Sequence, residues 1–157
     1  MEAKQISNQS ESPCMWRISR TKDSLITPEL IKLMEKYPYG SQQNKKIGER
    51  VCFAAFCLGT ITWYITEGSQ WGKNDYLFWS IMVEPNFTSI NDITASYLND
   101  IEIRDGFSPI IYRVGRDINF KPCKLSEIRD DYKLQKFITE MTELEESDDD
   151  DDDDDDY

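Results

Sequence analysis

Nine consecutive aspartates, Asp148 to Asp156, limit which part of this chain can fold. Like charges at this density repel one another and bury no apolar surface, so we expect the segment to be disordered and extended. Residues 143–157 contain 12 acidic side chains and no basic one. Removing these 12 from the 30 acidic residues of the chain leaves 18 acids against 18 Lys and Arg in residues 1–142. The net charge of −12 therefore belongs to the tail, and the body is neutral.

The body has the length and the aromatic content of one folded domain. All four Trp, all seven Phe and seven of the eight Tyr lie before residue 143. Residues 1–13 are polar and rich in Ser, Gln and Asn, which is typical of a disordered arm. We therefore expect three parts: an N-terminal arm over 1–13, a single domain over 14–142 and an acidic tail over 143–157.

Helix signals occur before, within and after the middle of the domain. Thr27-Pro28-Glu29 provides an N-cap, a proline at the first helical position and an acid in the first turn, and Pro38 ends that helix near Tyr37. Ser89-Ile90-Asn91-Asp92 resembles a capping box and predicts a short helix to about Leu98. Ser126-Glu127 predicts the start of a last helix.

Strand signals fill the region between these helices. Residues 51–66 are rich in β-branched and aromatic side chains. The predicted strands are 14–18, 51–58, 60–66, 76–83, 109–114 and 117–120, with a hairpin loop over 67–75. The fold class expected from these signals is α+β: a small, mostly antiparallel sheet with flanking helices, followed by a disordered acidic C-terminal tail.

The residue inventory excludes several chemistries. Without histidine there is no Ser-His-Asp triad, no His-activated cysteine and no imidazole metal ligand. Cys52 and Cys57 are five residues apart on a predicted strand, so they should point to opposite faces and pack as free thiols. No GxxxxGK[ST] or GxGxxG motif is present. We predict no metal site, no cofactor and no identifiable catalytic residues.

Two groups of charged residues in the body are alternative sites. Glu67, Asp75, Arg116 and Asp117 would form the cleft of a small carboxylate-based enzyme if the fold brought all four together. Lys45, Lys46 and Arg50 lie in one polar stretch of the same half as several aromatic residues, and such a cluster can contact nucleic acid.

The tail is the strongest functional signal, and three interpretations remain open. It can bind basic proteins by multivalent electrostatics, fold back onto the chain's own basic loop and shield it from nucleic acid, or act as a solubilising appendage. The candidate protein-binding residues are Asp148, Asp149, Asp150, Asp151, Asp152, Asp153, Asp154, Asp155 and Asp156.

The order of segments from Leu25 to Ile128 resembles an uncharacterised small-domain family carried by plasmids, phages, mobile elements and some large DNA viruses. The resemblance rests on four segments, and Gly115 and Asn119 depart from the family's usual acid and His. The matching segments are Leu25-Ile26-Thr27-Pro28-Glu29-Leu30, Thr62-Trp63-Tyr64-Ile65-Thr66-Glu67, Ser89-Ile90-Asn91-Asp92-Ile93 and Arg116-Asp117-Ile118-Asn119-Phe120 with Leu125-Ser126-Glu127. It implies a fold and a viral or mobile-element setting, and it carries no activity.

These observations favour a non-enzymatic interaction protein whose body binds a protein partner and whose Asp-rich tail engages basic surfaces. The alternatives are the small carboxylate-based enzyme and a nucleic-acid binder with an autoinhibitory acidic tail. The polar N-terminus has no apolar signal region, and no stretch approaches the ~20 apolar residues that span a bilayer. We therefore expect an intracellular protein, cytoplasmic or nuclear, that is not secreted and has no membrane partner.

Overall fold

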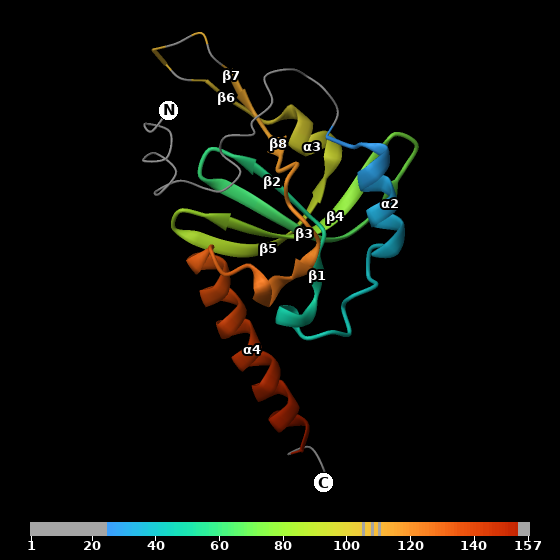
Figure 1. Ribbon diagram of the computed structural model, residues 1–157. Helices are drawn as coiled ribbons and strands as arrows, with labels where there is room; N and C mark the ends of the chain where they lie inside the picture. Colours follow the sequence, from blue (N-terminus) through green and yellow to red (C-terminus); the bar gives the residue numbers. More distant parts are fainter. Residues whose placement is uncertain (1–24, 105, 108, 110, 154–157) are drawn as a thin grey trace.

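The computed structural model describes residues 25–104, 106–107, 109 and 111–153, with the side chains of 148–153 left aside. The predicted arm over 1–13 and the predicted strand over 14–18 lie outside these residues. Within the described part, a mostly antiparallel sheet is combined with helices, which confirms the α+β prediction. Figure 1 shows the sheet at the centre, with helices on both sides of it.

Five strands form the main sheet, in the spatial order β5-β4-β3-β2-β8, and every neighbouring pair is antiparallel. Two smaller sheets flank it: β1 pairs with β9, and β6 pairs with β7. The strands are β1 (Val51–Cys52), β2 (Ala54–Leu58), β3 (Ile61–Trp71), β4 (Asp75–Glu84), β5 (Phe87–Thr94), β6 (Glu102–Arg104), β7 (Ile111–Arg113), β8 (Gly115–Arg116) and β9 (Cys123–Lys124). The helices are α2 (Pro28–Lys36), α3 (Ala95–Asp100) and α4 (Tyr132–Asp153), with 3-10 turns η3 (Ile47–Glu49) and η4 (Leu125–Glu127).

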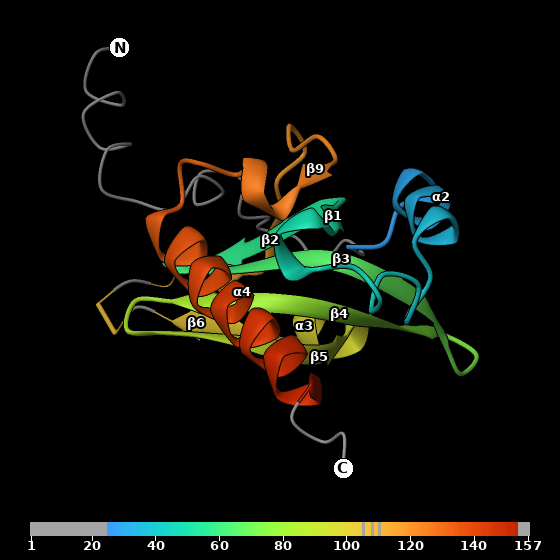
Figure 2. The ribbon, with the colours of Figure 1, turned by 90° about the horizontal axis from the view of Figure 1, so that it is seen from below.

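Apolar side chains are buried on both faces of the main sheet. On one face, Phe56, Trp63 and Phe78 pack with residues of α2 and α3. On the other face, Tyr64 and Ile81 pack with residues of η3, η4 and α4. Figure 2 shows α4 crossing that second face. Because period-2 alternation sends successive strand residues to opposite cores, strands with apolar residues on both faces need helices on both sides.

The first helix forms where its sequence signals place it. The Thr27 hydroxyl accepts a hydrogen bond from the N–H of Leu30 at 3.2 Å, and Pro28 occupies the first helical position. Leu30 and Met34, four residues apart, form the buried stripe. The helix ends at Lys36, with Tyr37 as its C-cap.

Four predicted elements differ from the structure. Ser89–Asp92 is part of β5 rather than a helix start, because its residues pair with β4, and α3 begins instead after the Thr94 N-cap. β3 continues to Trp71, so the hairpin loop shrinks to Gly72-Lys73-Asn74, with Gly72 at φ +76°. Residues 117–120 are not a strand, since the short β8 ends at Arg116. The Ser126 signal produces the turn η4, and α4 begins at Tyr132.

A break in the strand alternation corrects the prediction for the cysteines. Phe53 and Ala54 are consecutive residues, yet both belong to the same core, so the alternation slips by one between β1 and β2. As a result Cys52 and Cys57 face the same core rather than opposite ones. Neither cysteine forms a disulfide, and both are fully buried, as is typical of packing cysteines.

The last helix joins the domain to the acidic segment. Leu134 and Ile138 are buried against the sheet, and the helix then continues past Thr142, where the sequence predicts the tail to begin, as far as Asp153. Extending an existing helix costs less than starting one, which explains how the docked first turns carry the acidic residues with them. Residues 154–157 of the predicted tail lie outside the described part. No described helix combines the length and apolarity needed to cross a membrane.

Candidate functional site

A groove of about 710 Å³ lies between α2 and the segment that follows β8. Leu33, Phe53, Phe120 and Pro122 supply apolar surface to it. Polar and charged groups line the rest: Glu29, Lys32, Arg116, Asp117, Asn119 and Lys121. This volume is within the usual range of small-ligand sites, and apolar walls with a few polar groups are typical of such sites.

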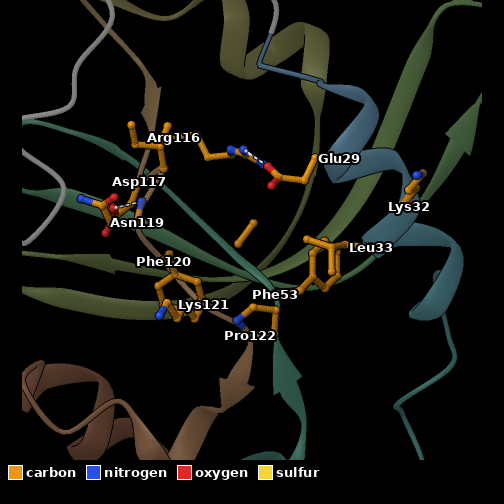
Figure 3. Close-up of a pocket in the computed structure, with 12 residues that line it drawn as sticks. Glu29, Lys32, Leu33, Phe53, Arg116, Asp117, Asn119, Phe120, Lys121 and Pro122 are labelled. Carbon is orange, nitrogen blue, oxygen red and sulfur yellow. Dashed lines mark hydrogen bonds and ion pairs between the residues drawn. The ribbon is translucent and has the colours of Figure 1, made fainter.

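Arg116 is the principal charged group of the groove. Its side chain is only 15% exposed, and Nη2 donates to Oε1 of Glu29 at 2.8 Å. Figure 3 shows the guanidinium reaching from the sheet edge toward α2, across the opening above Phe53 and Phe120. Glu29 is 75% exposed, so water competes with Arg116 for this carboxylate. Within the described part of the chain, the bond to Glu29 is the one hydrogen bond that the Arg116 side chain makes.

Asp117 and Asn119 shape the rim beside Arg116. The N–H of Asn119 donates to Oδ1 of Asp117 at 3.0 Å, which closes a tight turn. The N–H of Asp117 donates to the carbonyl of Ala55 at 2.9 Å, which fixes the turn to β2. The Arg116–Phe120 segment on which the family resemblance draws thus forms one wall of the groove.

Glu67 lies in a different place and is fully buried. A bulge between Ile65 and Glu67 shifts the register of β3, so Glu67 lies opposite Trp79 rather than on the face of Ile65. Its carboxylate accepts hydrogen bonds from the backbone N–H groups of Gly40 (2.7 Å) and Gln42 (2.9 Å) and from Nε2 of Gln43 (2.9 Å). Glu67 therefore fixes the loop after α2 to the sheet.

Asp75 is at the far end of the β3–β4 hairpin. Its carboxylate accepts hydrogen bonds from the N–H of Tyr76 (2.8 Å) and from the N–H (3.0 Å) and hydroxyl (2.5 Å) of Ser96. Burial raises the pKa of Asp75, but these hydrogen bonds outweigh it and hold the pKa below its usual value. Of the four residues of the predicted cleft, only Arg116 and Asp117 share a site. The carboxylate-enzyme alternative requires all four side chains to come together in one cleft, and the fold does not bring them together.

The predicted nucleic-acid cluster is divided by burial. Lys45 and Lys46 are exposed, whereas Arg50 is only 7% exposed. The Arg50 guanidinium donates to the carbonyls of Lys45 (3.1 Å) and Gln43 (3.4 Å) and lies 5.0 Å from the ring centroid of Trp79. Burial lowers the pKa of Arg50, and the charges of Glu67 and Glu145 oppose that shift. Arg50 is a loop anchor, so Lys45 and Lys46 are the exposed members of the predicted cluster.

The acidic half of α4 runs beside this loop. Oε1 of Glu145 accepts a hydrogen bond from the N–H of Ile47 at 3.4 Å. Ile47 itself is buried against α4, and η3 follows Lys45 and Lys46 directly in the chain. The contact brings Glu145, one of the first acids of the predicted tail, to the turn that follows Lys45 and Lys46. Figure 1 shows the same helix extending beyond the sheet at its C-terminal end.

No family model, no curated protein and no solved structure matches this chain. The resemblance to the mobile-element family is thus a prediction that rests on the quoted residues alone.

Sequence reasoning missed the α2 side of the groove. Glu29, Lys32 and Leu33 are more than 80 residues from Arg116, and nothing in their local pattern links them to it. Phe53 and Ala54 also line the groove, but in the sequence they belong to a continuous apolar run that signals only a buried strand.

Proposed function

We propose that this chain is a non-enzymatic interaction protein that presents its acidic C-terminal helix to a basic protein partner, while its body binds a partner as well. The observation that carries the proposal is the division of α4 into two halves. Leu134 and Ile138 fix the first half to the sheet, and the second half carries the acids of the chain away from a neutral body. Long-range attraction to a basic surface then originates in one place.

Helical presentation should increase affinity beyond that of a free polyanion. The described helix has no basic residue in its last turn, and its acids lie at the negative end of the helix dipole. A cationic surface reduces both the unfavourable interaction of these acids with the helix dipole and the repulsion between neighbouring aspartates. Binding and helix formation in this segment should therefore favour each other.

The proposed setting is intracellular, cytoplasmic or nuclear, in a virus or mobile element. The free thiols of Cys52, Cys57 and Cys123 fit a reducing compartment. The family resemblance alone supports the viral or mobile-element origin.

The test uses a lysine-rich peptide of about 20 residues as the probe and three forms of the protein. The first is the parent chain. The second replaces Asp148–Asp156 with Asn, which removes charge at constant size. The third is Leu144→Pro, which keeps every charge and interrupts α4 at an exposed position, at a cost of about 3 kcal/mol to the helix.

We expect the Asn form to lose most of the binding and its dependence on salt, because exposed charges are screened over a Debye length of about 8 Å. The Leu144→Pro form should bind several-fold more weakly than the parent. If the Asn form binds as tightly as the parent, the tail is not the binding element. If Leu144→Pro binds as tightly as the parent, helical presentation plays no part.

A second candidate function follows from the Glu145 contact with Ile47. If the acids of α4 shield Lys45 and Lys46, the Asn form should bind single-stranded DNA more tightly than the parent does. A double variant, Lys45→Gln with Lys46→Gln, should cancel that gain. Equal, negligible DNA binding by all forms would exclude the autoinhibited nucleic-acid binder.

A further inference from the structure

We propose that the groove between α2 and β8 binds an organic carboxylate with an apolar body, and that Arg116 holds its carboxylate group after Glu29 releases it. The groove contains none of the acidic residues of α4, so this site goes beyond the acidic-helix function. Three observations carry the proposal: the unused donors of Arg116, the exposure of its present partner, and the apolar surface beside them.

The donors of Arg116 are the first observation. A guanidinium has five N–H donors in a planar fork, and this one uses a single bond to one oxygen of Glu29 within the described chain. The side chain is mostly withdrawn from water, at 15% exposure. Arginine pairs most favourably with a carboxylate through two parallel hydrogen bonds, which Glu29 does not supply. The site therefore retains capacity for an incoming carboxylate.

The partner of Arg116 is the second observation. Glu29 lies in the first turn of α2 and is 75% exposed, so releasing it into water costs little. A ligand carboxylate replaces one anion by another and leaves Arg116 paired throughout. Lys32 and Lys121 at the rim add positive charge, and Asp117 is the remaining acid of the lining.

The apolar walls are the third observation, and they select the body of the ligand. Phe53 and Leu33 lie on one side of the groove, and Phe120 and Pro122 lie on the other. Covering these side chains gains about 25 cal/mol for each Å² of apolar surface removed from water. A small hydrophilic anion such as acetate gains the ion pair alone, so an aryl or alkyl carboxylate should bind more tightly.

The experiment is a titration of ¹⁵N-labelled protein with 3-phenylpropionate, with its primary amide as the uncharged counterpart. We expect the backbone signals of Ala54 and Asn119 to shift with the acid and to remain unchanged with the amide. A second arm uses the peptide acetyl-Gly-Gly-Phe with a free C-terminus, and its C-terminal amide. Tighter binding of the peptide acid than of the free acid would identify a protein C-terminus as the source of the carboxylate, and the reverse would identify a small metabolite.

Two substitutions with opposite expected signs separate a ligand site from a structural ion pair. Arg116→Gln should weaken 3-phenylpropionate binding at least about tenfold, because a charged hydrogen bond in a half-buried site is lost. Glu29→Gln should strengthen binding several-fold, because it removes the competing carboxylate. Arg116→Lys, which keeps the charge but not the fork, should be intermediate and checks that loss of binding is not loss of fold.

The control is an ion pair outside the groove. Nζ of Lys124 donates to Oε1 of Glu49 at 2.9 Å, and both side chains are about half exposed. Lys124→Gln and Glu49→Gln should leave binding unchanged. The proposal is overturned if the acid and its amide shift the same signals equally, if neither shifts them at about 10 mM, or if Glu29→Gln weakens binding as Arg116→Gln does.

Discussion

Replacing Glu67 should show whether this carboxylate serves the fold. Three donors converge on it: the backbone N–H groups of Gly40 and Gln42 and the side-chain amide of Gln43. The bond from Gln42 is buried, whereas the other two are partly exposed to water. A hydrogen bond to a charged group contributes roughly 1.5–3 kcal/mol, and exposure reduces the contribution of two of the three.

From these contacts we expect Glu67→Ala to lower the free energy of unfolding by about 3–4 kcal/mol. Glu67→Gln keeps the shape but turns an NH₂ group toward N–H donors, and should cost about 2 kcal/mol. The matched control is Glu49→Gln, which breaks an exposed pair with Lys124 and should leave the urea midpoint unchanged.

The assay is urea unfolding followed by tryptophan fluorescence, since Trp63 and Trp79 are buried and report loss of the core. The slope of the transition should be the same for all forms, so that midpoints can be compared directly. A Glu67→Ala protein within about 1 kcal/mol of the parent would refute the reasoning, because the carboxylate would then not fix the loop and would be free for chemistry.

Three further outcomes follow from the contacts. Gly68→Ala should lower Tm, at a cost of about 1–3 kcal/mol by calorimetry, because the new Cβ would lie 2.8 Å from the Phe78 ring. Asp92→Asn should bring the pKa of Tyr39 down from about 12 toward 10 in an NMR titration, because the hydrogen bond to Asp92 is the main cause of the raised pKa. In the parent, the stability that this bond contributes is present below pH 10 and is lost as the pH rises through about 12. Raising NaCl from about 20 mM to 500 mM should move the ¹³Cα shifts of residues 143–153 toward helical values, because salt screens the repulsion between their acids.

Local sequence signals are sufficient to predict a helix or strand that forms because of its own residues. The Thr27 cap, the proline after it and the buried pair Leu30 and Met34 identified α2 within the sequence. The apolar and aromatic residues of 76–83 likewise predict a strand without reference to its neighbours, and the structure has β4 there. The fold class followed from such elements.

Long-range pairing explains where those signals failed. Ser89–Asp92 has the composition of a capping box, yet the eight-residue ladder with β4 holds it in β5. The two-residue strands β8 and β9 exist only because β2 and β1 lie beside them. Tertiary context overrides local propensity in both cases.

The candidate site was predicted in part for a related reason. Residue type alone places Arg116 and Asp117 in a cleft with Glu67 and Asp75, whereas the structure keeps only Arg116 and Asp117 together. A one-residue bulge turns Glu67 toward the loop after α2, and no composition rule anticipates it. The α2 wall of the groove depends on how the helix packs, and sequence spacing does not record that.

The continuity of α4 means that the body and the acidic segment do not act as independent modules. Ile138 and Met141 pack on the domain, and Glu145, one turn later, accepts a hydrogen bond from Ile47. A partner that neutralises the acids and extends the helix would strengthen the turns on which that contact depends. Dissociation of that partner would weaken these helical turns and, with them, the Glu145–Ile47 contact beside Lys45 and Lys46. If the Glu145–Ile47 contact couples the two segments, a basic peptide bound to the tail should change the hydrogen exchange of the Ile47 amide, and an unchanged exchange rate would show that the tail and the basic loop are independent.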